Sequence, residues 1–429
     1  MLSQLLIAVA LVAQAPAAGA ADATADQVRT LVRELDAPQR AARDEAERRL
    51  LELGRAALPH LANLPAGASA ETVLRVNRVR ATLYRTQAAA SLGGSRVTLD
   101  VKDVPLQQVL DDLEKQTANK LHDFRRQFGQ QAGDIRVTLK LDNATFWQAV
   151  DALCAATGLE VYHFAGHDGL ALVASTVAAD TAASAKKPVV YAGAFRLEAR
   201  RLVASRDASG TAPGELQIVW DTAWEPRLKP LFFTVCAARL SAVDDLGATF
   251  SARNPELVVE LPPQGKACRV EMSTAYNLPP ERKAQKLAEL KGEIDVLLPA
   301  ELHTFRFNDL DRGDVREERA GAVSVSLDRV RSSDGTVSVP VRIKYDNAAN
   351  ALESHRAWFY KNPAYLETAD GVRTEPGSIE LLRQSQDELT LNLIFAPEGD
   401  WRGQTLVYAT PADIVVLPIA FAFRDLPLP

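Results

Sequence analysis

The strongest constraint on the fold is a strand–helix pattern that occurs twice, 40 residues apart. RVTLDVKDVPLQQVLDDLEKQT begins at Arg96, and RVTLKLDNATFWQAVDALCAAT begins at Arg136. Each copy starts with the alternating period of a strand and continues with the three-to-four-residue period of a helix. The positions that recur are Val97, Thr98, Leu99, Gln108, Asp111, Leu113 and Thr117, matched by Val137, Thr138, Leu139, Gln148, Asp151, Leu153 and Thr157. The repeat predicts a small αβ unit in which two helices cover one face of a sheet.

Local signals mark the ends of these elements. Pro105 is expected to open the first helix, where its missing N–H costs nothing, and Gly158 to end the second. Two short strands are expected to follow, at residues 159–164 and 169–174. Cys154, on or beside the apolar stripe of the second helix, is predicted to be a small core residue.

The order strand, DVPLQQVLDDLEKQT, strand, NATFWQAVDALCAATGLEVY, strand resembles the short N-terminal domain of secretins and TonB-dependent receptors. The resemblance covers residues 96–174, about 80 residues of the 429, within a predicted unit at 95–174. Residues 121–134 depart from it, since that family usually has another short strand there. The resemblance implies a periplasmic docking module that meets partner proteins and is not catalytic.

The N-terminus is typical of a secretory signal peptide. Nine apolar residues, Leu5 to Ala13, precede a stretch of small residues, although no Lys or Arg comes before them. Ala18-Gly19-Ala20 is the expected cleavage site, so residues 1–20 are assigned to the signal peptide. An uncleaved anchor helix is the alternative, but a membrane span needs about 20 apolar residues. We expect export to the periplasm or cell envelope of a Gram-negative-type bacterium, with no membrane span in the mature chain.

Residues 26–91 have helical periodicity, interrupted at Asp36-Ala37-Pro38 and again at Gly54, where a helix end is expected. Within about 26–64, LVRELDAPQRAARDEAERRLLELGRAALPHL resembles a HEAT-type helical hairpin. A solenoid needs about three repeats, so these helices must pack on another element. A basic stretch then follows, formed by Arg75, Arg78, Arg80 and Arg85. It suits either a phosphate or acidic-polymer patch or, as we favour, a solvated helix face whose long side chains cover apolar surface.

The remainder of the chain has the alternating period of β-strands. Residues 175–188 are small and polar and are assigned to a linker. Two antiparallel β-sandwiches are predicted, at 189–318 and at 321–429, the second immunoglobulin-like. Asp334-Gly335 is a hairpin signal, and Pro340 is expected at an edge or bulge. The predicted fold class is therefore multidomain α+β: N-terminal helical hairpins, the two-helix αβ module and two sandwiches.

Composition and motifs argue against several functions. The 49 Lys and Arg residues against 55 Asp and Glu give a net charge of -6, which disfavours a nucleic-acid binder. The sequence contains no nucleophile elbow, phosphate-binding glycine loop, H-E-x-x-H or paired C-x-x-C. We therefore predict a protein that is not an enzyme, with no catalytic residues and no cofactor.

Two clusters of polar residues are candidate metal sites. His163, His167 and Asp168 could supply ligands, but they flank a tight connection between two strands and are predicted to be turn residues. Residues Asp309, Asp311, Gly313 and Asp314 suggest a calcium loop, but the glycine falls at position 5 of that loop, where the EF-hand requires position 6. An acidic interdomain loop is the prediction, and no metal is expected.

Cysteines and aromatic residues provide two further candidate features. Cys236 and Cys268 lie in strand-like runs of the first sandwich and form either a disulfide or two buried thiols. Trp358, Phe359 and Tyr360 are a candidate contact surface, whereas Trp220 continues an inward-facing series and is assigned to the core.

Three functions remain open from the sequence. The first is an exported, non-catalytic scaffold that binds an envelope protein by strand addition at an open edge of the small sheet. The second is carbohydrate or cell-wall binding through the sandwiches, with Trp358 and Tyr360 in contact. The third is a hydrolase with dispersed carboxylates, for example among Asp244, Asp245, Glu301 and His303.

Overall fold

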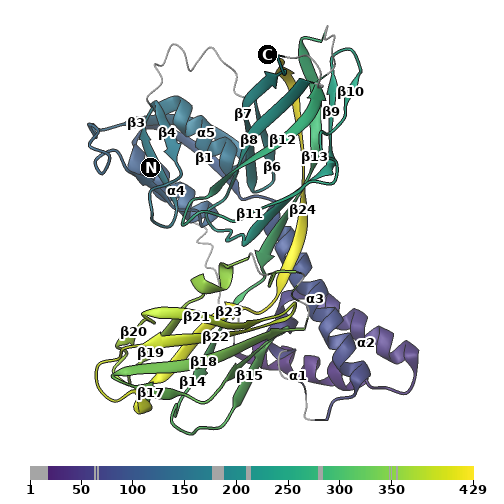
Figure 1. The fold of residues 1–429 in the computed structure, drawn as a ribbon, viewed down its shortest axis with the longest axis vertical. Helices are drawn as coiled ribbons and strands as arrows, with labels where there is room; N and C mark the ends of the chain where they lie inside the picture. The colour runs from purple at the N-terminus through teal and green to yellow at the C-terminus, as the bar shows by residue number, and fades with distance from the viewer. Residues whose placement is uncertain are drawn as a thin grey trace, which may run out of the picture.

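The protein consists of two lobes joined by a narrow waist, as Figure 1 shows. One lobe contains the αβ module and the first sandwich, and the other contains the second sandwich and the N-terminal helices. The computed structural model describes residues 18–61, 64, 67–175, 188–208, 214–278, 284–346, 348, 350–353 and 356–429. The hydrophobic part of the predicted signal peptide and nearly all of the predicted linker lie outside these ranges. Helices in the N-terminal part and antiparallel sheets elsewhere confirm the predicted multidomain α+β class.

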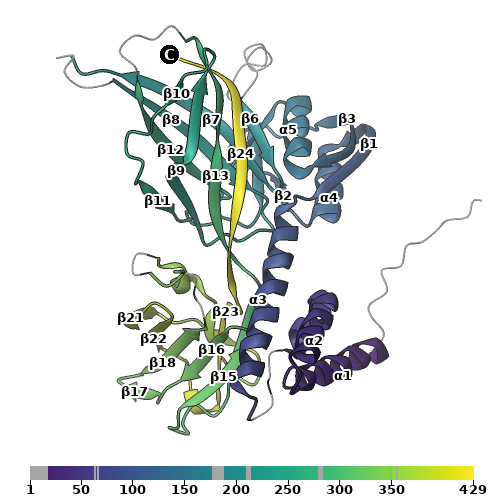
Figure 2. The ribbon, with the colours of Figure 1, turned by 90° about the vertical axis from the view of Figure 1, so that its right-hand side faces the viewer.

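Helices α1 (Ala18–Glu34), α2 (Arg40–Glu52) and α3 (Ala70–Leu92) form the N-terminal region, with a 3-10 helix at Gly54–His60. The predicted break at residues 36–38 falls between α1 and α2, and Gly54 has φ +60° just after the cap of α2. The 23 residues of α3 extend over about 35 Å. Figure 2 shows α3 running from one lobe to the other beside β24 (Ile414–Pro427). The N-terminal helices therefore pack on another element, β24, as predicted for a region too short to form a solenoid.

The αβ module contains two small sheets with both helices between them, which corrects the predicted single sheet. Its elements are β1 (Arg96–Pro105), α4 (Leu106–Thr117), β2 (Leu121–Asp123), β3 (Arg136–Thr145), α5 (Phe146–Thr157), β4 (Leu159–Tyr162) and β5 (Leu170–Ala174). β1 and β3 form an antiparallel ribbon, and β2, β5 and β4 form the other sheet in that order. The apolar faces of α4 and α5 are wide enough to contact both sheets, so one sheet alone would leave them exposed. The 121–134 segment does supply a short strand, β2, parallel to β5.

The first sandwich packs a β10-β9-β13-β24 sheet, with β11 also on β9, against a β12-β8-β7-β6 sheet. Its other strands are β6 (Val189–Ala192), β7 (Phe195–Ser205), β8 (Gly214–Trp224), β9 (Phe232–Asp244), β10 (Thr249–Phe250), β11 (Val258–Leu261), β12 (Arg269–Leu278) and β13 (Lys286–Pro299). Backbone hydrogen bonds from Arg253 to Ala275 and from Asn277 to Ser251 join the two sheets along one side. Trp220 is fully buried between them, as predicted.

The second sandwich packs a β14-β23-β19-β20 sheet against a β15-β16-β18-β22-β21 sheet, with β17 on β18. Its strands are β14 (Leu302–Phe307), β15 (Arg316–Ala320), β16 (Val323–Leu327), β17 (Arg331–Ser333), β18 (Thr336–Tyr345), β19 (Ala364–Glu367), β20 (Arg373–Thr374), β21 (Ser378–Gln384), β22 (Glu388–Phe395) and β23 (Thr405–Pro411), with 3-10 turns at Trp358–Lys361 and Trp401–Gly403. This sandwich has a hydrophobic core of its own. A separate, continuous core runs from the N-terminal helices through the αβ module into the first sandwich.

The strand pairing corrects the predicted division between the sandwiches. β14 precedes the predicted boundary at residues 318–321 but pairs with β23 of the second sandwich. β24 ends the chain but pairs with β13 of the first sandwich, from Lys286 with Pro427 to Pro299 with Ile414. The reason is that long-range pairing, which alternation does not encode, decides the sheet to which a strand belongs. As a result, β13, β24 and α3 all cross the waist.

Two local predictions in β18 have different outcomes. Asp334 (φ 50°) and Gly335 (φ 77°) form the predicted hairpin turn between β17 and β18. Pro340, by contrast, lies in a central strand and not at an edge. It is tolerated because it falls where the partner changes from β16 to β17, beside the connecting loop. There its carbonyl accepts from the N–H of Asp328, and no ladder hydrogen bond requires its missing N–H.

Candidate functional site

A buried carboxylate fixes the αβ module to the first sandwich. Glu225, just after β8, has no exposed surface. It accepts hydrogen bonds from the backbone N–H (2.7 Å) and hydroxyl (2.6 Å) of Ser95 and from the amide of Asn119 (3.0 Å). Arg227 pairs with the same carboxylate at 2.6 Å and also donates to the carbonyl of Ser91 at the end of α3 (2.7 Å). The cluster ties α3, the module and the sandwich together, with every carboxylate oxygen satisfied.

A second polar contact lies at α5. Arg196 of β7 donates to Asp151 of α5 at 2.9 Å and to Glu198 at 2.6 Å. Despite burial, Arg196 and Arg200 lower the pKa of Glu198. Trp147, also on α5, donates from its indole N–H to the carbonyl of Ala194 at 3.1 Å. These contacts hold the module in one orientation on the sandwich.

The far side of the module carries an open strand edge. Figure 2 places the β1–β3 ribbon on the side of the module that faces away from the first sandwich. In the described part of the chain, β3 pairs with β1 alone. On β1 the side-chain amide of Gln116 accepts from the N–H of Thr98 (3.0 Å) and donates to its carbonyl (3.2 Å), so it occupies those backbone groups as a strand would. β3, which is ten residues long, therefore presents along its outer edge the alternate backbone groups that point away from β1, and another strand can add there.

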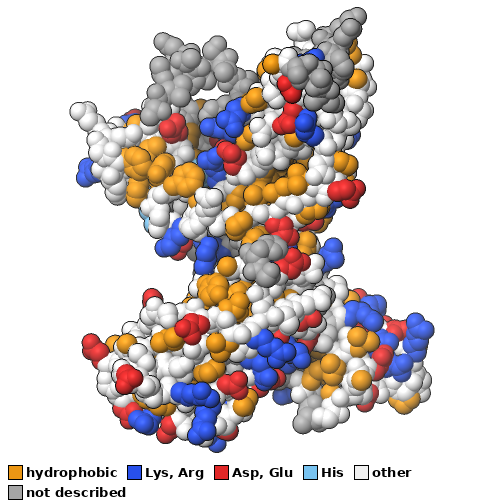
Figure 3. Space-filling model, in the orientation of Figure 1, with side chains coloured by type: hydrophobic (Ala, Val, Ile, Leu, Met, Phe, Trp, Pro, Cys, Tyr) orange, Lys and Arg blue, Asp and Glu red, His pale blue; other side chains and the backbone are white. Residues whose placement is uncertain are grey.

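A groove lies between the two lobes. It encloses about 890 Å³ and is lined by the 228–232 and 262–268 segments, the 357–363 segment, and Asp168-Gly169 of the module. Figure 3 shows that the molecule narrows at this waist, with hydrophobic side chains above and below it. Its apolar lining residues include Trp224, Leu228, Pro230, Phe232, Pro262, Pro263, Trp358 and Pro363. Such a volume suits a small-molecule or peptide ligand.

The predicted aromatic contact surface is not a continuous exposed surface. Trp358 and Phe359 are 7% and 2% exposed and belong to the core of the second sandwich. The indole N–H of Trp358 donates to the carbonyl of Ala351 at 2.7 Å. Tyr360, at 39%, is the exposed member. The three residues form a 3-10 turn, in which successive side chains point in different directions, so they do not form one sugar-stacking platform.

The possible disulfide does not form, and all three cysteines are thiols. Cys236 lies on the outward face of β9, between core-facing Val235 and Ala237, with its sulfur 3.8 Å from the guanidinium of Arg239. Cys268 precedes β12 in the opposite sheet and is buried. The two side chains therefore point in different directions from different sheets. Cys154 packs partly buried against the core, as predicted.

The residues weighed as metal ligands do not converge. His163 lies beside Trp147, with ring centroids 6.4 Å apart, whereas His167 lies against Phe124 and His122 at 4.7 Å. The Asp309–Asp314 loop joins β14 to β15 inside the second sandwich and is not interdomain. Within the described ranges, no group of three or more His, Cys, Asp and Glu is placed to hold a metal ion.

Two of the four arginines of the basic stretch of α3, Arg75 and Arg78, form ion pairs. Arg75 is buried and pairs with Glu71, Asp44 and Glu47 at 2.6–2.8 Å. The prediction of a solvated face is therefore wrong for buried Arg75 and Arg80, whereas Arg78 and Arg85 are exposed. Glu47 also pairs with Arg78 at 3.5 Å. The acidic residues of α2 thus meet the basic residues of α3 and join the two helices.

The four residues of the hydrolase hypothesis lie far apart. Asp244 is opposite Leu287 at one end of β13, whereas Glu301 and His303 lie beyond Pro299 at the other end. A strand of this length separates them by about 40 Å. The carboxylate of Asp244 instead accepts from the backbone of the turn that follows it, at Leu246 (2.9 Å) and Ala248 (2.8 Å). No single cleft can contain all four residues.

Comparisons with known proteins give no relative: no family model, curated protein or solved structure matches this chain. In the part of the chain that the structure describes, no helix combines the length and apolar character needed to cross a membrane.

Sequence reasoning missed the Glu225 cluster and the groove. Glu225 meets Ser95 across 130 residues and Asn119 across 106, and no local pattern links them. The groove did leave a signal, because prolines beside apolar or aromatic residues recur in KPLFF, LPPQG and KNPAY. All three segments line it.

Proposed function

We propose that the protein is an exported, non-catalytic scaffold of the cell envelope of a Gram-negative-type bacterium, which binds a partner protein through the αβ module. The observation that supports this is the combination of a rigid mount and an open edge. Glu225 and Arg196 fix one side of the module to the first sandwich, and the opposite side presents β3. A docking surface of this kind loses little entropy on binding because it is already ordered.

Strand addition is the proposed contact. A partner segment that pairs with β3 extends the ribbon to three strands, with backbone hydrogen bonds giving affinity and alternate side chains giving selectivity. Exposed Lys140 of β3, which pairs with Asp100 of β1 at 3.0 Å, marks the solvent-facing side of the ribbon. Charged residues there oppose indiscriminate edge-to-edge aggregation and favour a chosen partner.

Site-specific photo-crosslinking in cells tests this proposal. A photoreactive residue at Lys140 should trap one envelope protein, and the same residue at exposed Arg383 on β21 should not. With that protein purified, backbone amides of β3 should exchange hydrogen more slowly in the complex. An adduct formed equally from both positions, or β3 amides that exchange unchanged in the complex, would reject docking at this edge. Fractionation of cells tests export separately, since a protein found only in the cytoplasm contradicts it.

The groove supports a second candidate function, the binding of an apolar ligand. Trp224 and Trp358 both line it and are its natural reporters. A fluorescent apolar probe such as anilinonaphthalene sulfonate should bind the folded protein saturably and quench tryptophan emission. Leu228→Arg, which places a charge in the groove, should weaken that binding about tenfold. Unchanged probe affinity in Leu228→Arg would exclude the groove.

A further inference from the structure

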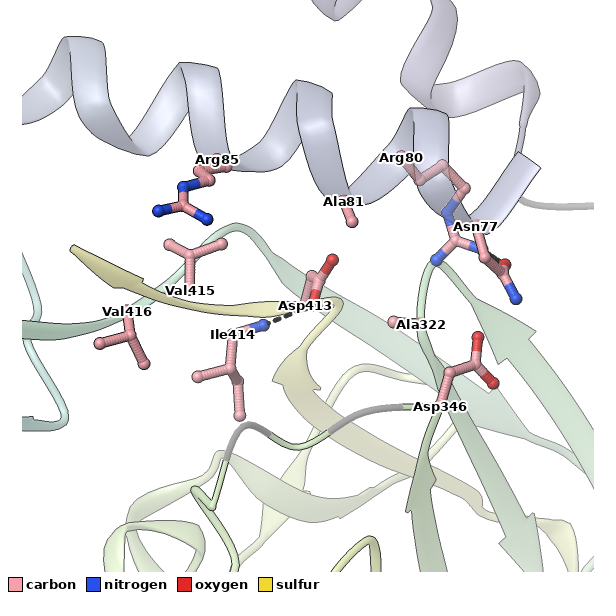
Figure 4. Close-up of a pocket in the computed structure, with 10 residues that line it drawn as sticks. All are labelled: Asn77, Arg80, Ala81, Arg85, Ala322, Asp346, Asp413, Ile414, Val415 and Val416. Carbon is pink, nitrogen blue, oxygen red and sulfur yellow. Dashed lines mark hydrogen bonds between the residues drawn. The ribbon is translucent and has the colours of Figure 1, made fainter. Parts of the chain in front are cut away.

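A second, polar pocket lies where α3 meets the turn between β23 and β24, away from both surfaces discussed above. It encloses about 330 Å³. Figure 4 shows the residues that line it, with Arg80 and Arg85 extending from α3 and the carboxylate of Asp413 pointing up toward α3 between them. Asp346 approaches from the second sandwich, at the end of β18.

Arg80 is buried in this pocket with unused hydrogen-bonding capacity. It is 3% exposed, and one amino group of its guanidinium, Nη1, donates to the side chain of Asn77 at 3.3 Å. The other amino group, Nη2, is buried and has no hydrogen-bond partner in the described residues. The guanidinium fits because residue 321 is glycine: a Cβ there would lie 2.9 Å from Nη2. A buried, unsatisfied guanidinium nitrogen is costly unless a ligand or water completes it.

Positively and negatively charged side chains both face the cavity, but they do not form ion pairs with one another across it. No ion pair joins Arg80 to either carboxylate, although all three groups are described and line the same pocket. Among the described residues, the carboxylate of Asp413 accepts a hydrogen bond only from the neighbouring N–H of Ile414 (2.8 Å), while Asp346 pairs with Arg319. An anion alone would be repelled by the carboxylates, and a cation alone by the guanidinium groups. A ligand with one charge of each sign suits the arrangement.

The remaining wall is apolar and small. Ala81, Ala322, Ile414 and Val415 supply it, which limits the ligand to a short hydrocarbon side chain. We propose that this pocket binds a small apolar α-amino acid as a zwitterion, with its carboxylate on Arg80 and its ammonium group on Asp413. Bidentate guanidinium–carboxylate contact gives both charge and geometric selectivity. The proposal is independent of the docking function, because none of these residues belongs to the module.

Binding should release protons near pH 6. Burial raises the pKa of Asp413 to about 6. The hydrogen bond from Ile414 and the positive charge of Arg80 oppose this shift in part, and the negative charge of Asp346 adds to it. The other titratable and charged groups nearby are Tyr84 and Arg85 of α3, with Arg319 acting on Arg80 and Glu301 acting on Tyr84. An ammonium ion against Asp413 would stabilise its ionised form and expel the fraction of protons bound at that pH.

Isothermal titration calorimetry of the full chain at pH 6 tests the site, with alanine, propionate and ethylamine as probes. Alanine should bind saturably, and at least roughly tenfold more tightly than either single-charge probe. The heat should depend on the ionisation heat of the buffer, because protons are released. Asp413→Asn should weaken alanine binding roughly tenfold and abolish that buffer dependence. Arg85→Ala should weaken binding by no more than about threefold, since it removes only a positive charge at the exposed mouth of the pocket.

Arg78→Ala is the matched control, because Arg78 lies on the same helix but pairs with Glu47 outside the pocket. This variant should bind alanine as tightly as the wild type does. Circular dichroism confirms that each variant is folded. The proposal is overturned if alanine does not bind the wild type, if propionate or ethylamine binds as tightly as alanine, or if folded Asp413→Asn retains wild-type affinity.

Discussion

Glu225 and Ser95, 130 residues apart in the chain, are joined by two hydrogen bonds to one buried carboxylate. The same carboxylate binds Asn119 and Arg227, so a single side chain holds the start of the αβ module against the first sandwich. The module is therefore attached by directional polar contacts as well as by the continuous apolar core.

Glu225→Ala should destabilise the protein by about 3–5 kcal/mol, because it removes the acceptor of Ser95 and of buried Asn119 and the counter-charge of Arg227. Urea unfolding followed by circular dichroism measures the change. Asp370→Ala, which removes an exposed carboxylate of the second sandwich, should stay within about 0.5 kcal/mol of wild type. Equal losses in the two variants would show that Glu225 is not an anchor.

Gly193→Ala should disrupt the junction between α3 and the first sandwich. Gly193 has φ +60°, and a Cβ there would lie 2.0 Å from the carbonyl oxygen of Leu92. Both backbones are fixed at this point, since the N–H of Ala194 donates to that same carbonyl at 2.8 Å. We expect a loss of about 3 kcal/mol or more in the free energy of unfolding.

Gly371→Ala is the control for that substitution, because Gly371 also has positive φ (82°) but an open surrounding. It should cost about 1–2 kcal/mol from backbone strain alone. A loss no larger in Gly193→Ala than in Gly371→Ala would contradict the close approach.

Local signals predicted much of the fold, and long-range pairing accounts for what they missed. The helical period of Leu106, Val109, Leu110 and Leu113 identified α4, and the alternation at Leu216, Ile218 and Trp220 identified β8. Both patterns depend on residues a few positions apart. The partner of β24 is β13, more than 100 residues earlier in the chain. The sequence pattern of neither strand predicts that the two will pair.

The candidate sites follow the same rule. Trp358 was open to interpretation because it lies in a short 3-10 turn with no periodicity, and only packing against the second sandwich buries it. The Arg80 pocket combines α3 with residues 322, 346 and 413–416, so its members are scattered along the sequence. The basic stretch did contain Arg80 and Arg85, but the acids that face them could not be assigned from spacing.

Asp413 should make the ligand-free protein less stable as the pH rises. Burial raises its pKa from 3.8 to about 6, so the folded state holds the proton more tightly than the unfolded chain. The favourable contribution is complete below about pH 3.8 and is lost as the pH rises through 6, a change of about 3 kcal/mol. Asp413→Asn mimics the protonated form and should be more stable than wild type at pH 7.5, with equal stability at pH 4. Urea midpoints at both pH values measure this, and parallel midpoints would contradict it.

The titration of His163 should have the opposite effect on stability. It should weaken the contact between the αβ module and the first sandwich as the pH falls. Burial lowers the pKa of His163 to about 3, and Arg269 and Arg196 add to the effect, with Glu198 opposing and Arg200 reinforcing it. The folded state therefore keeps the imidazole neutral, while the unfolded chain takes up a proton below about pH 6.5. Stability is full above that pH and should fall by about 2 kcal/mol by pH 5.

His163→Phe preserves the ring contact with Trp147 and removes the titrating group. Between pH 7 and pH 5, the free energy of unfolding of this variant should drop by about 2 kcal/mol less than that of the wild type. His303→Phe, at a solvent-exposed position on β14, should follow the wild-type curve. If His163→Phe loses as much stability as wild type over this interval, acid acts elsewhere in the protein and the module contact does not respond to His163.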